Sequence, residues 1–463
     1  MKKIIYSIFS LIVLFNVVSC SDESLEPTLA QALDVEGNVN NLSDVRGILN
    51  GMYDRMSKSG YWGRDIIICG EVRGDNVFAN ANSGRFLTVG EMNLTSSTAE
   101  ATNIWQQAYR VVANANIVIN ATGITGNLQQ INQAKGEALA ARALAHFDLL
   151  RVFGQQHVTG QGGMNSLGVP YVKEYKGANQ FPPRLTVDQC KQFVYADLDA
   201  ALGLMSVSLN STTKQTISTH AVNAIKSRVA TYFGDTAIAL TASAAVIGQF
   251  SIIPAAGFQA SWSQAAAPSN SIFELSQLAN DNNGINGIAN IYRGTAYGDI
   301  QVLNEFPVNA EFSVTDVRNS VGMIAVVTGR LRNQGKYPTM GVFSDKIKVI
   351  RYEEIVLNYA EALLATNPAG ALVQLNSIAT ARNGSTYTVA TLVNILKERR
   401  KELCFEGFRF DDLARTGRNI PVLNIINQTH GGPSYGSFKY AFPIPLSEVN
   451  ANPNVAQNLG YTN

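Results

Sequence analysis

Apolar residues recur at helical spacing along most of the chain. Between Asn41 and Ser59 they stand three or four positions apart, which places them on one face of a helix. The residues on that face are Leu42, Val45, Leu49, Met52 and Met56. The same spacing, in segments rich in Ala, Val, Ile and aromatic residues, covers 97–122, 128–153, 187–206 and 217–244. The pattern therefore predicts five helices before residue 245.

Three further helices are predicted near the C-terminus. The first has one apolar face made by Tyr352, Val356, Tyr359 and Leu363. Asn367-Pro368 ends that helix and begins the next, because Asn caps a helix and Pro fits its first turn. This second helix runs to about Arg382 and stops at Asn383-Gly384.

The third of these helices is predicted over 388–406. Its face consists of Leu392, Ile395, Leu396, Arg399 and Leu403, and Gly407 is expected as its C-terminal cap.

A segment of different composition separates the two helical blocks. Residues 245–344 contain ten glycines and many Ser and Asn residues, so we expect loops and short strands there. Short turns between neighbouring helices favour antiparallel pairs, and the small residues Ala138, Ala141 and Ala145 would allow close helix crossing, as in tetratricopeptide-type units. No strict 34-residue repeat is visible. The expected fold is mostly α, with helical blocks at 41–244 and 345–416 and the loop-rich insert between them.

The N-terminus has the pattern of a lipoprotein signal peptide. Lys2 and Lys3 precede a mainly apolar run, Ile4–Val18, that ends at Ser19-Cys20. The run is too short to span a bilayer, and the ending is similar to a lipobox, in which cleavage leaves Cys20 as the first, lipid-carrying residue. We therefore predict a signal peptide at 1–19, a lipid anchor on Cys20 and a polar tether over 20–40. An ordinary signal peptide with an incidental Cys is the alternative.

Composition excludes several classes of function. Removing residues 1–19 leaves 34 Lys and Arg against 35 Asp and Glu, a formal charge of −1. A nucleic-acid partner is not expected, because binding nucleic acid requires a basic face. The other cysteines, Cys69, Cys190 and Cys404, lie far apart with no metal-site or disulfide pattern, so we expect buried thiols.

Four C-terminal motifs carry a resemblance to a known family. Arg351–Ala362 resembles the "R-x-x-E-x-x-L-x-x-A-E-A" helix of the SusD/RagB family of nutrient-binding lipoproteins. The segments 375–384 and 397–415 are similar to its "L-N-x-I-R-x-R-A-G" and "E-R-x-x-E-L-x-F-E-G-x-R-x-x-D-L-x-R" motifs. The ending 442–461 is similar to "P-I-P…N-P…Q-N-P-G-Y", with Leu459 in place of the usual Pro.

This resemblance implies a SusD-like fold and a function in binding without catalysis. Such a protein would be anchored by its lipid to the outer membrane and face the cell exterior, to which the acidic Ser21-Asp22-Glu23 would direct it. Its loops would hold an oligosaccharide over a SusC-like TonB-dependent transporter. A RagB-like peptide-binding protein is the alternative, and a surface glycosidase would require two opposed carboxylates that the sequence does not single out.

The charged residues of these motifs have a structural interpretation from their spacing. Glu398 with Lys401, and Arg399 with Glu402, stand three apart and can pair on one helix. Glu406, Arg409, Asp411, Asp412 and Arg415 can join that helix to the next segment, and the motif helix adds Arg351, Glu354 and Glu361. A catalytic role for Glu398 and Glu402 is not expected, since residues four apart on one helix point the same way.

A search for enzyme chemistry gives no convincing site. Gly432–Gly436 fits G-x-S-x-G but lacks the strand before it and the helix after it. The four histidines have no metal-ligand spacing, and His146 is expected to pack within its helix. Asp281–Gly284 is interpreted as a turn and not as a calcium loop. Beyond the covalent lipid, no cofactor or metal is predicted.

Ligand-binding candidates come from composition alone. A sugar site requires aromatic rings that stack on the sugar, with Asn, Asp and Arg beside them. Two expected loop regions provide these residue types, the first around 61–76 and the second around 262–297, whereas Trp105 is assigned to helix packing. The candidates are Trp62, Arg73, Asp75, Asn76, Trp262, Tyr292 and Tyr297.

Overall fold

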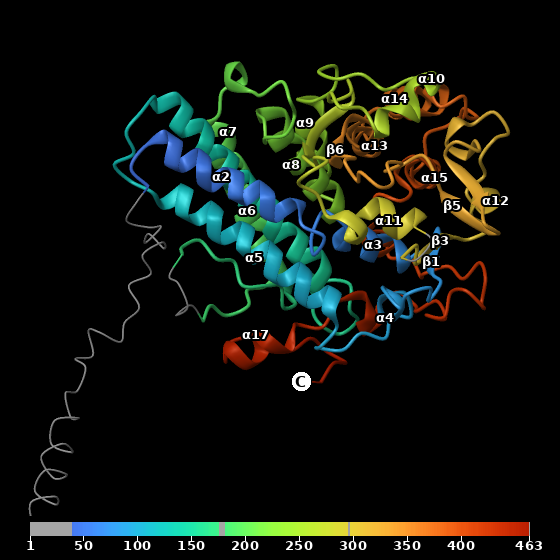
Figure 1. Cartoon of the computed structure of the whole chain (residues 1–463), viewed down its shortest axis with the longest axis horizontal. Coiled ribbons are helices and arrows are strands. Elements are labelled where there is room, and N and C mark those ends of the chain that lie inside the picture. The colour runs from blue at the N-terminus through green and yellow to red at the C-terminus, as the bar shows by residue number, and fades with distance from the viewer. Residues whose placement is uncertain (1–38, 176–180, 295–296, 463) are drawn as a thin grey trace, which may run out of the picture. The chain divides into compact units, whose positions relative to one another are not determined.

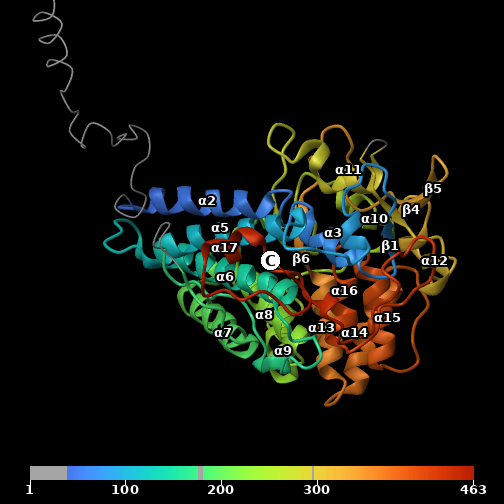
Figure 2. The same ribbon diagram turned by 90° about the horizontal axis from the view of Figure 1, so that it is seen from below.

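Helices packed side by side form the first half of the structure. In this computed structural model α5, α6, α7 and α8 follow one another, each against the next, and α2 packs on α5 and α6 (Figures 1 and 2). The structure describes residues 39–175, 181–294 and 297–462, so the predicted signal peptide, Cys20 and residues 20–38 of the predicted tether lie outside the described residues. The helices of this half are α2 (Leu42–Ser57), α3 (Asp65–Val72), α4 (Leu87–Gly90), α5 (Ala99–Asn120), α6 (Leu128–Phe153), α7 (Val187–Leu204), α8 (Thr219–Phe233) and α9 (Thr236–Ala244).

Local sequence signals fix where these helices begin. Asn41 and Asp44 form a capping box at the start of α2, and Thr186 and Gln189 form one at the start of α7. Each box satisfies backbone N–H groups that the first helical turn leaves without a partner.

The predicted helix over 217–244 is wrong as a single element. The structure divides it into α8 and α9, because Gly234 adopts a left-handed conformation (φ 73°) that ends α8. The two helices then pack against each other instead of continuing along one axis.

The C-terminal helices form a second group that meets the first at α8 and α9. Asn367 caps α14 and Pro368 occupies its first turn, as predicted. The third predicted helix is shorter than expected, since it ends before the turn that contains Gly407 (φ 90°). The helices are α13 (Tyr352–Leu363), α14 (Pro368–Ala381), α15 (Leu392–Leu403), α16 (Arg409–Arg415) and α17 (Leu446–Ala451), and α13 packs on α8, α9, α14 and α15.

Short strands and helices occupy the predicted loop-rich insert, and two of the strands lie outside its bounds. The strands are β1 (Val77–Ala79), β2 (Ser271–Leu275), β3 (Ile300–Val302), β4 (Ile324–Val327), β5 (Arg330–Asn333) and β6 (Ile347–Arg351). They pair antiparallel as β1 with β3, β2 with β6 and β4 with β5, and a bulge interrupts the β2–β6 register near Phe273. The short helices are α10 (Ala255–Phe258), α11 (Ile288–Arg293) and α12 (Phe306–Asn309), and single 3₁₀ turns cover Gly163–Asn165, Val207–Leu209, Ala260–Trp262, Gly284–Asn286, Val317–Asn319 and Phe438–Tyr440.

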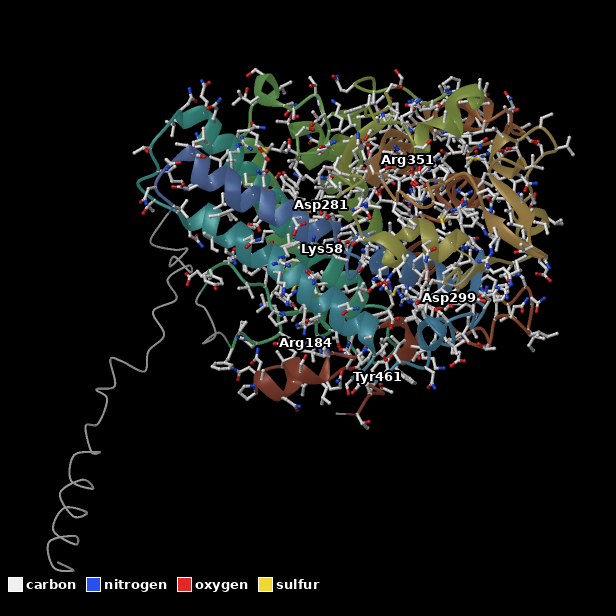
Figure 3. The ribbon with its side chains drawn as sticks, viewed as in Figure 1. Lys58, Arg184, Asp281, Asp299, Arg351 and Tyr461 are labelled. Atoms are coloured by element: carbon white, nitrogen blue, oxygen red, sulfur yellow. The ribbon has the colours of Figure 1, made fainter. Side chains whose placement is uncertain are left out.

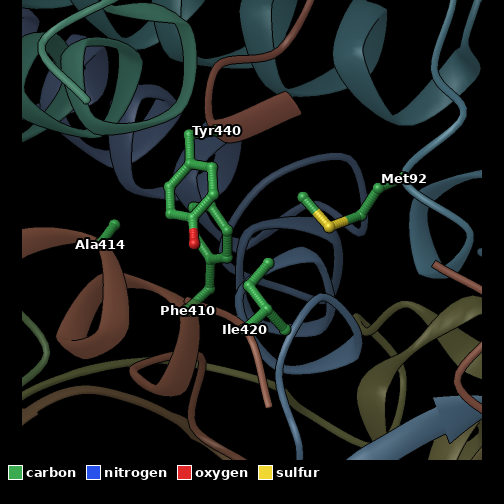
Figure 4. Close-up of a cluster of buried hydrophobic side chains, with 5 residues drawn as sticks. All are labelled: Met92, Phe410, Ala414, Ile420 and Tyr440. Atoms are coloured by element: carbon green, nitrogen blue, oxygen red, sulfur yellow. The ribbon is translucent and has the colours of Figure 1, made fainter. Parts of the chain in front are cut away.

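Apolar side chains from distant parts of the sequence meet beneath α16. Met92 packs with Phe410, Ala414, Ile420 and Tyr440 in one buried cluster (Figure 4). This cluster holds the C-terminal segment against the loop after α4. Among the helices of the described residues, none is long and apolar enough to cross a membrane.

Candidate functional site

The charged motif residues form a buried ion-pair network. Arg351 donates from Nη1 to Glu402 (2.6 Å) and from Nε to Glu406 (2.8 Å), and it lies at the end of β6 (Figure 3). Glu402 also accepts from Arg382 (2.8 Å) and Arg318 (3.1 Å). All five side chains are buried, so these pairs fix the orientation of α15 relative to β6 and α14.

One predicted ion pair on α15 is confirmed and the other is wrong. Lys401 lies 2.8 Å from Glu398, as expected. Arg399 instead pairs with Asp412 on α16 (3.1 Å), because Glu402 faces the guanidinium groups of Arg318, Arg351 and Arg382.

The remaining motif residues also join helices. Arg415 binds Glu361 of α13 (2.6 Å) and Asp412 (2.8 Å), so α16 is tied to α13. Glu354 of α13 accepts two hydrogen bonds from Arg228 of α8 (2.6 Å each). The arrangement is structural, since each carboxylate is occupied by an arginine of the same chain.

Ion pairing controls protonation throughout this network. The arginines around Glu402 hold its pKa well below the usual range despite burial, chiefly Arg382, then Arg351 and Arg318. Arg351 and Lys336 likewise lower the pKa of Glu406, and Arg399 and Arg415 lower that of Asp412. These carboxylates are therefore ionised and unsuited to act as general acids.

The predicted ligand residues of the first region lie in the interior. Residues 65–72 form a helix and not a loop, and all of them are buried. Arg73 is buried against the ring of Phe410 (3.6 Å to the centroid), and burial lowers its pKa to about 10. Asp75 pairs with Arg409 (2.5 Å), and Asn76 accepts from Arg400 (2.8 Å). All three proposed ligand groups thus have partners within the protein.

Two aromatic candidates of the second region are also buried. Trp262 is 2% exposed and packs edge-on against Tyr337 (5.3 Å), with the ammonium group of Lys336 5.0 Å from its ring. Tyr292 is fully buried and donates its hydroxyl to the Phe405 carbonyl (3.2 Å). Neither ring offers a face to a sugar in this conformation.

Trp62 lies at a small cavity, which we call the junction pocket. Its indole N–H donates to Asp148 (2.9 Å), while its ring borders the cavity. Water-sized atoms can be centred in about 30 Å³ of this pocket, which is too small for a pyranose ring. It is lined by residues of α6, α8, α13, α15 and α16, among them Arg151, Arg228, Arg399, Arg415, Thr231 and Phe408.

Tyr297 differs from the other candidates because its side chain is only half-buried. The guanidinium group of Arg85 lies over its ring at 4.3 Å, and the same Arg donates to Asn286 (2.8 Å). Arg330 of β5 donates to Asn82 (3.1 Å) in the loop that contains Arg85. We call Asn82, Arg85, Asn286, Tyr297 and Arg330 the Tyr297 cluster.

Strand pairing brings the Tyr297 cluster together. Ala79 of β1 is opposite Ile300 of β3, so the loop after β1 and the residues before β3 emerge at the same edge. The buried carboxylate of Asp299 accepts from the backbone N–H (2.5 Å) and hydroxyl (2.6 Å) of Ser83, which fixes the loop there (Figure 3).

The loop of the cluster has unusual backbone conformations. Ala81 (φ 59°) and Phe86 (φ 58°) are non-glycine residues in the left-handed region, and Gly84 (φ 81°) lies between them. Such strain collects at binding sites, where surrounding contacts hold it. A half-buried ring, two arginines and two asparagines, gathered around this fixed loop from separate segments, are able to stack on and hydrogen-bond a polar ligand.

Two minor sequence motifs behave as predicted. The segment 432–436 has neither a preceding strand nor a following helix, so it is not a nucleophile elbow. Asp281–Gly284 contains a turn, in which the Asn282 side chain accepts from the Gly284 N–H (2.7 Å). In the parts of the chain that the structure describes, no group of three or more His, Cys, Asp and Glu side chains could hold a metal ion.

Two family models match the chain in succession. The model described as starch-binding associating with outer membrane matches residues 22–231, and the SusD family model matches residues 305–461.

Individual proteins agree with these matches. SusD-like protein P38 from Formosa agariphila is 23% identical over 98% of both chains. SusD-like protein P2 from the same organism is 30% identical, over 33% of this chain and 30% of its own length. A SusD superfamily protein of known structure from Bacteroides thetaiotaomicron is 29% identical with a TM-score of 0.81, and the match covers 90% of this chain and 99% of that one. The mostly helical fold, the buried motif network and these matches agree, and the chain belongs to the SusD/RagB family of non-catalytic binding proteins.

Proposed function

We propose that this protein is a lipid-anchored outer-membrane protein that binds an oligosaccharide outside the cell and delivers it to a SusC-like TonB-dependent transporter. The description of the family model that matches residues 22–231, starch-binding associating with outer membrane, is the observation that carries this proposal. The lipobox at Cys20 supports the anchor, and the acidic residues after it support the outward orientation.

The Tyr297 cluster is the proposed ligand site. It combines a half-buried aromatic ring with the polar groups of Arg85, Asn286 and Arg330. Sugar recognition uses this combination, since the ring contacts the apolar face of a sugar and the polar groups bond its hydroxyls.

A peptide ligand is the second candidate. Tyr297 is the one aromatic residue of the cluster, beside two arginines that could bind carboxylates of an acidic peptide. A site with a single stacking ring favours peptides more than a site with several rings would.

Calorimetric titration of the mature lipoprotein in detergent tests both candidates. The ligands are polysaccharides, host glycans and peptide digests, and each mixture is then checked for breakdown products. We expect saturable glycan binding without products, weakened about tenfold or more by Tyr297→Ala through loss of stacking.

Tyr435→Ala is the matched control. Tyr435 is another tyrosine outside the helices and strands, 40% exposed, and it contacts His157 and not the cluster. Binding of peptides alone would favour the second candidate. Product formation, or equal effects of the two substitutions, would contradict the proposal.

The transporter requires a separate test. We expect a SusC-like barrel to co-purify with this protein from outer membranes, and a gene for such a barrel to lie beside its own. If neither is found, the delivery role fails while ligand binding still stands.

A further inference from the structure

The junction pocket contains hydrogen-bond donors that no protein acceptor uses. Arg151 donates from Nε to Asp148 and from Nη1 to Asp411. Arg399 donates from Nε to Asp412 and from Nη1 to Asn358. Within the described residues no hydrogen bond involves Arg151 Nη2 or Arg399 Nη2, so each guanidinium group keeps one free end.

Arg228 shows the same pattern on the side of α8. Its Nε and Nη2 donate to Glu354, and Nη2 also donates to the Val349 carbonyl, which leaves Nη1 without an acceptor in the described structure. The three free Nη atoms are not fully enclosed by the protein, so each keeps surface that a small molecule can reach. All three arginines line the junction pocket.

Thr231 adds an unpartnered hydroxyl to the same lining. The residue is 7% exposed, and its Oγ1 is enclosed without a hydrogen-bond partner among the described residues. A buried hydroxyl left in this way is unfavourable unless a ligand or water satisfies it.

The acceptors of the lining are largely occupied. Both oxygens of Glu354 bind Arg228, and both oxygens of Asp412 accept from Arg399. Burial raises the pKa of Asp411, which reduces the negative charge at the pocket as the pH falls. The unsatisfied groups are therefore mainly donors, and the missing partner is an acceptor.

We infer that the junction pocket binds a small monovalent anion, a halide or formate, held by the free Nη groups of Arg151, Arg228 and Arg399 and by the Thr231 hydroxyl. The pocket offers about 30 Å³ for atom centres, which fits about two or three water-sized atoms and excludes larger anions. Such an ion would join α6, α8 and α15 through their arginines. The site is independent of the proposed glycan function.

Thermal unfolding of the mature lipoprotein in detergent tests the inference. Sodium chloride, bromide and formate are compared with sodium gluconate at equal ionic strength, because gluconate is too large for the pocket. We expect the unfolding temperature to rise with chloride, bromide or formate and to saturate. Which of the three acts identifies the ion, whereas equal curves in all four salts would overturn the proposal.

Thr231→Val removes the hydroxyl and keeps the shape of the side chain. We expect the apparent Kd for the anion to increase about tenfold, the effect of one hydrogen bond to a charged acceptor. Thr241→Val on α9 is the matched control, because that hydroxyl donates to the Ala237 carbonyl outside the pocket. An unchanged Kd for Thr231→Val would contradict the proposal.

Crystals of the wild-type protein grown in sodium bromide give a direct readout. Anomalous scattering should place bromide within hydrogen-bond distance of Thr231 Oγ1. A pocket holding only water at saturating bromide would exclude a halide, and together with no stabilisation by formate it would overturn the inference.

Discussion

Glu402 shows how strongly one motif residue depends on its neighbours. It is fully buried and accepts hydrogen bonds from Arg318, Arg351 and Arg382. Glu402→Gln would leave three buried cations short of a charge, so we expect a loss of about 3–5 kcal/mol in the free energy of unfolding. Urea denaturation measures this loss. Asp54→Asn, which breaks the exposed pair with Lys58, should cost less than about 1 kcal/mol, and a similar cost for both would contradict the structural role.

His146 makes the free energy of unfolding depend on pH, and the direction of its lowered pKa sets the sign of this dependence. It is fully buried, stacks on Tyr171 (3.8 Å between centroids) and accepts from the Val172 N–H (3.0 Å), and burial lowers its pKa to about 3. The unfolded chain then binds more protons than the folded protein between pH 3 and about 6.5. The contribution of His146 to the free energy of unfolding is therefore complete above pH 6.5. It is lost as the pH falls, by up to about 1.4 kcal/mol per pH unit.

His146→Gln isolates that contribution, because glutamine retains a donor and an acceptor but does not titrate. We expect the free energy of unfolding to decrease less steeply from pH 7 to pH 5 in the variant than in the wild type. Burial raises the pKa of Asp65 to about 6, and this group makes the folded protein more stable as the pH falls. The quantity to measure is therefore the difference in free energy of unfolding between the wild type and the variant at each pH. Parallel pH profiles would show that His146 does not titrate as stated.

The burial of a single side chain was predictable where the neighbouring sequence indicates its surroundings. Trp105 lies on the buried face of α5 and His146 lies in the middle of α6, and both pack in the interior as predicted. Trp62 and Trp262 could not be placed in this way, because an aromatic ring among glycine and serine has the same local sequence in a core as on a surface. Their burial depends on Asp148 and Lys336, which are distant in sequence.

Element boundaries follow glycine as much as hydrophobic periodicity. Gly407 has φ 90°, and a Cβ atom built on it would lie 2.9 Å from Ile67 Cα, so its turn packs directly on the backbone of α3. Gly160 has a similar φ of 80° with open space around it. These two positions separate the cost of backbone strain from the cost of crowding.

Gly407→Ala should therefore destabilise the protein more than Gly160→Ala. Both substitutions carry the strain of a left-handed residue, about 1–2 kcal/mol, and the first adds a clash with backbone that cannot rotate away. We expect at least about twice the loss for Gly407→Ala in urea denaturation. Equal losses would mean that the close approach to Ile67 relaxes at little cost.

The elements missed from the sequence lacked one-sided patterns. All eight residues of α3 are buried, so no polar face marks that segment as a helix. β2 and β6 are buried along their whole length, Glu274 and Lys348 included, so polar and apolar positions do not mark a solvent side and a core side. The amphipathic helices α2 and α5, by contrast, each have one buried face and were predicted from it.

The Tyr297 cluster depends on the arrangement of the whole chain. Tyr297 itself could be proposed from its glycine-rich surroundings, but Asn82 and Arg85 precede it by more than two hundred positions in the sequence. Only the pairing of β1 with β3 brings them together. No pattern within either segment predicts that pairing, since each strand is three residues long.

At the scale of the whole molecule, the proposed function requires that the protein remain at a membrane. The proposed attachment is the lipid on Cys20, which lies outside the described residues. Each buried CH₂ of an acyl chain contributes about 0.8 kcal/mol, and a single chain binds only marginally, so stable anchoring needs the several chains of a lipoprotein.

Cys20→Ser should remove the acceptor of the lipid and leave the folded body intact. We expect the wild-type protein to partition into the detergent phase of a detergent–water separation and to lose that partitioning in the variant. Cys190→Ser is the matched control, because Cys190 is a buried thiol of α7 and should not affect attachment. If Cys20→Ser still enters the detergent phase, the protein is held at the membrane by something other than this lipid, and the anchor part of the proposed function is wrong.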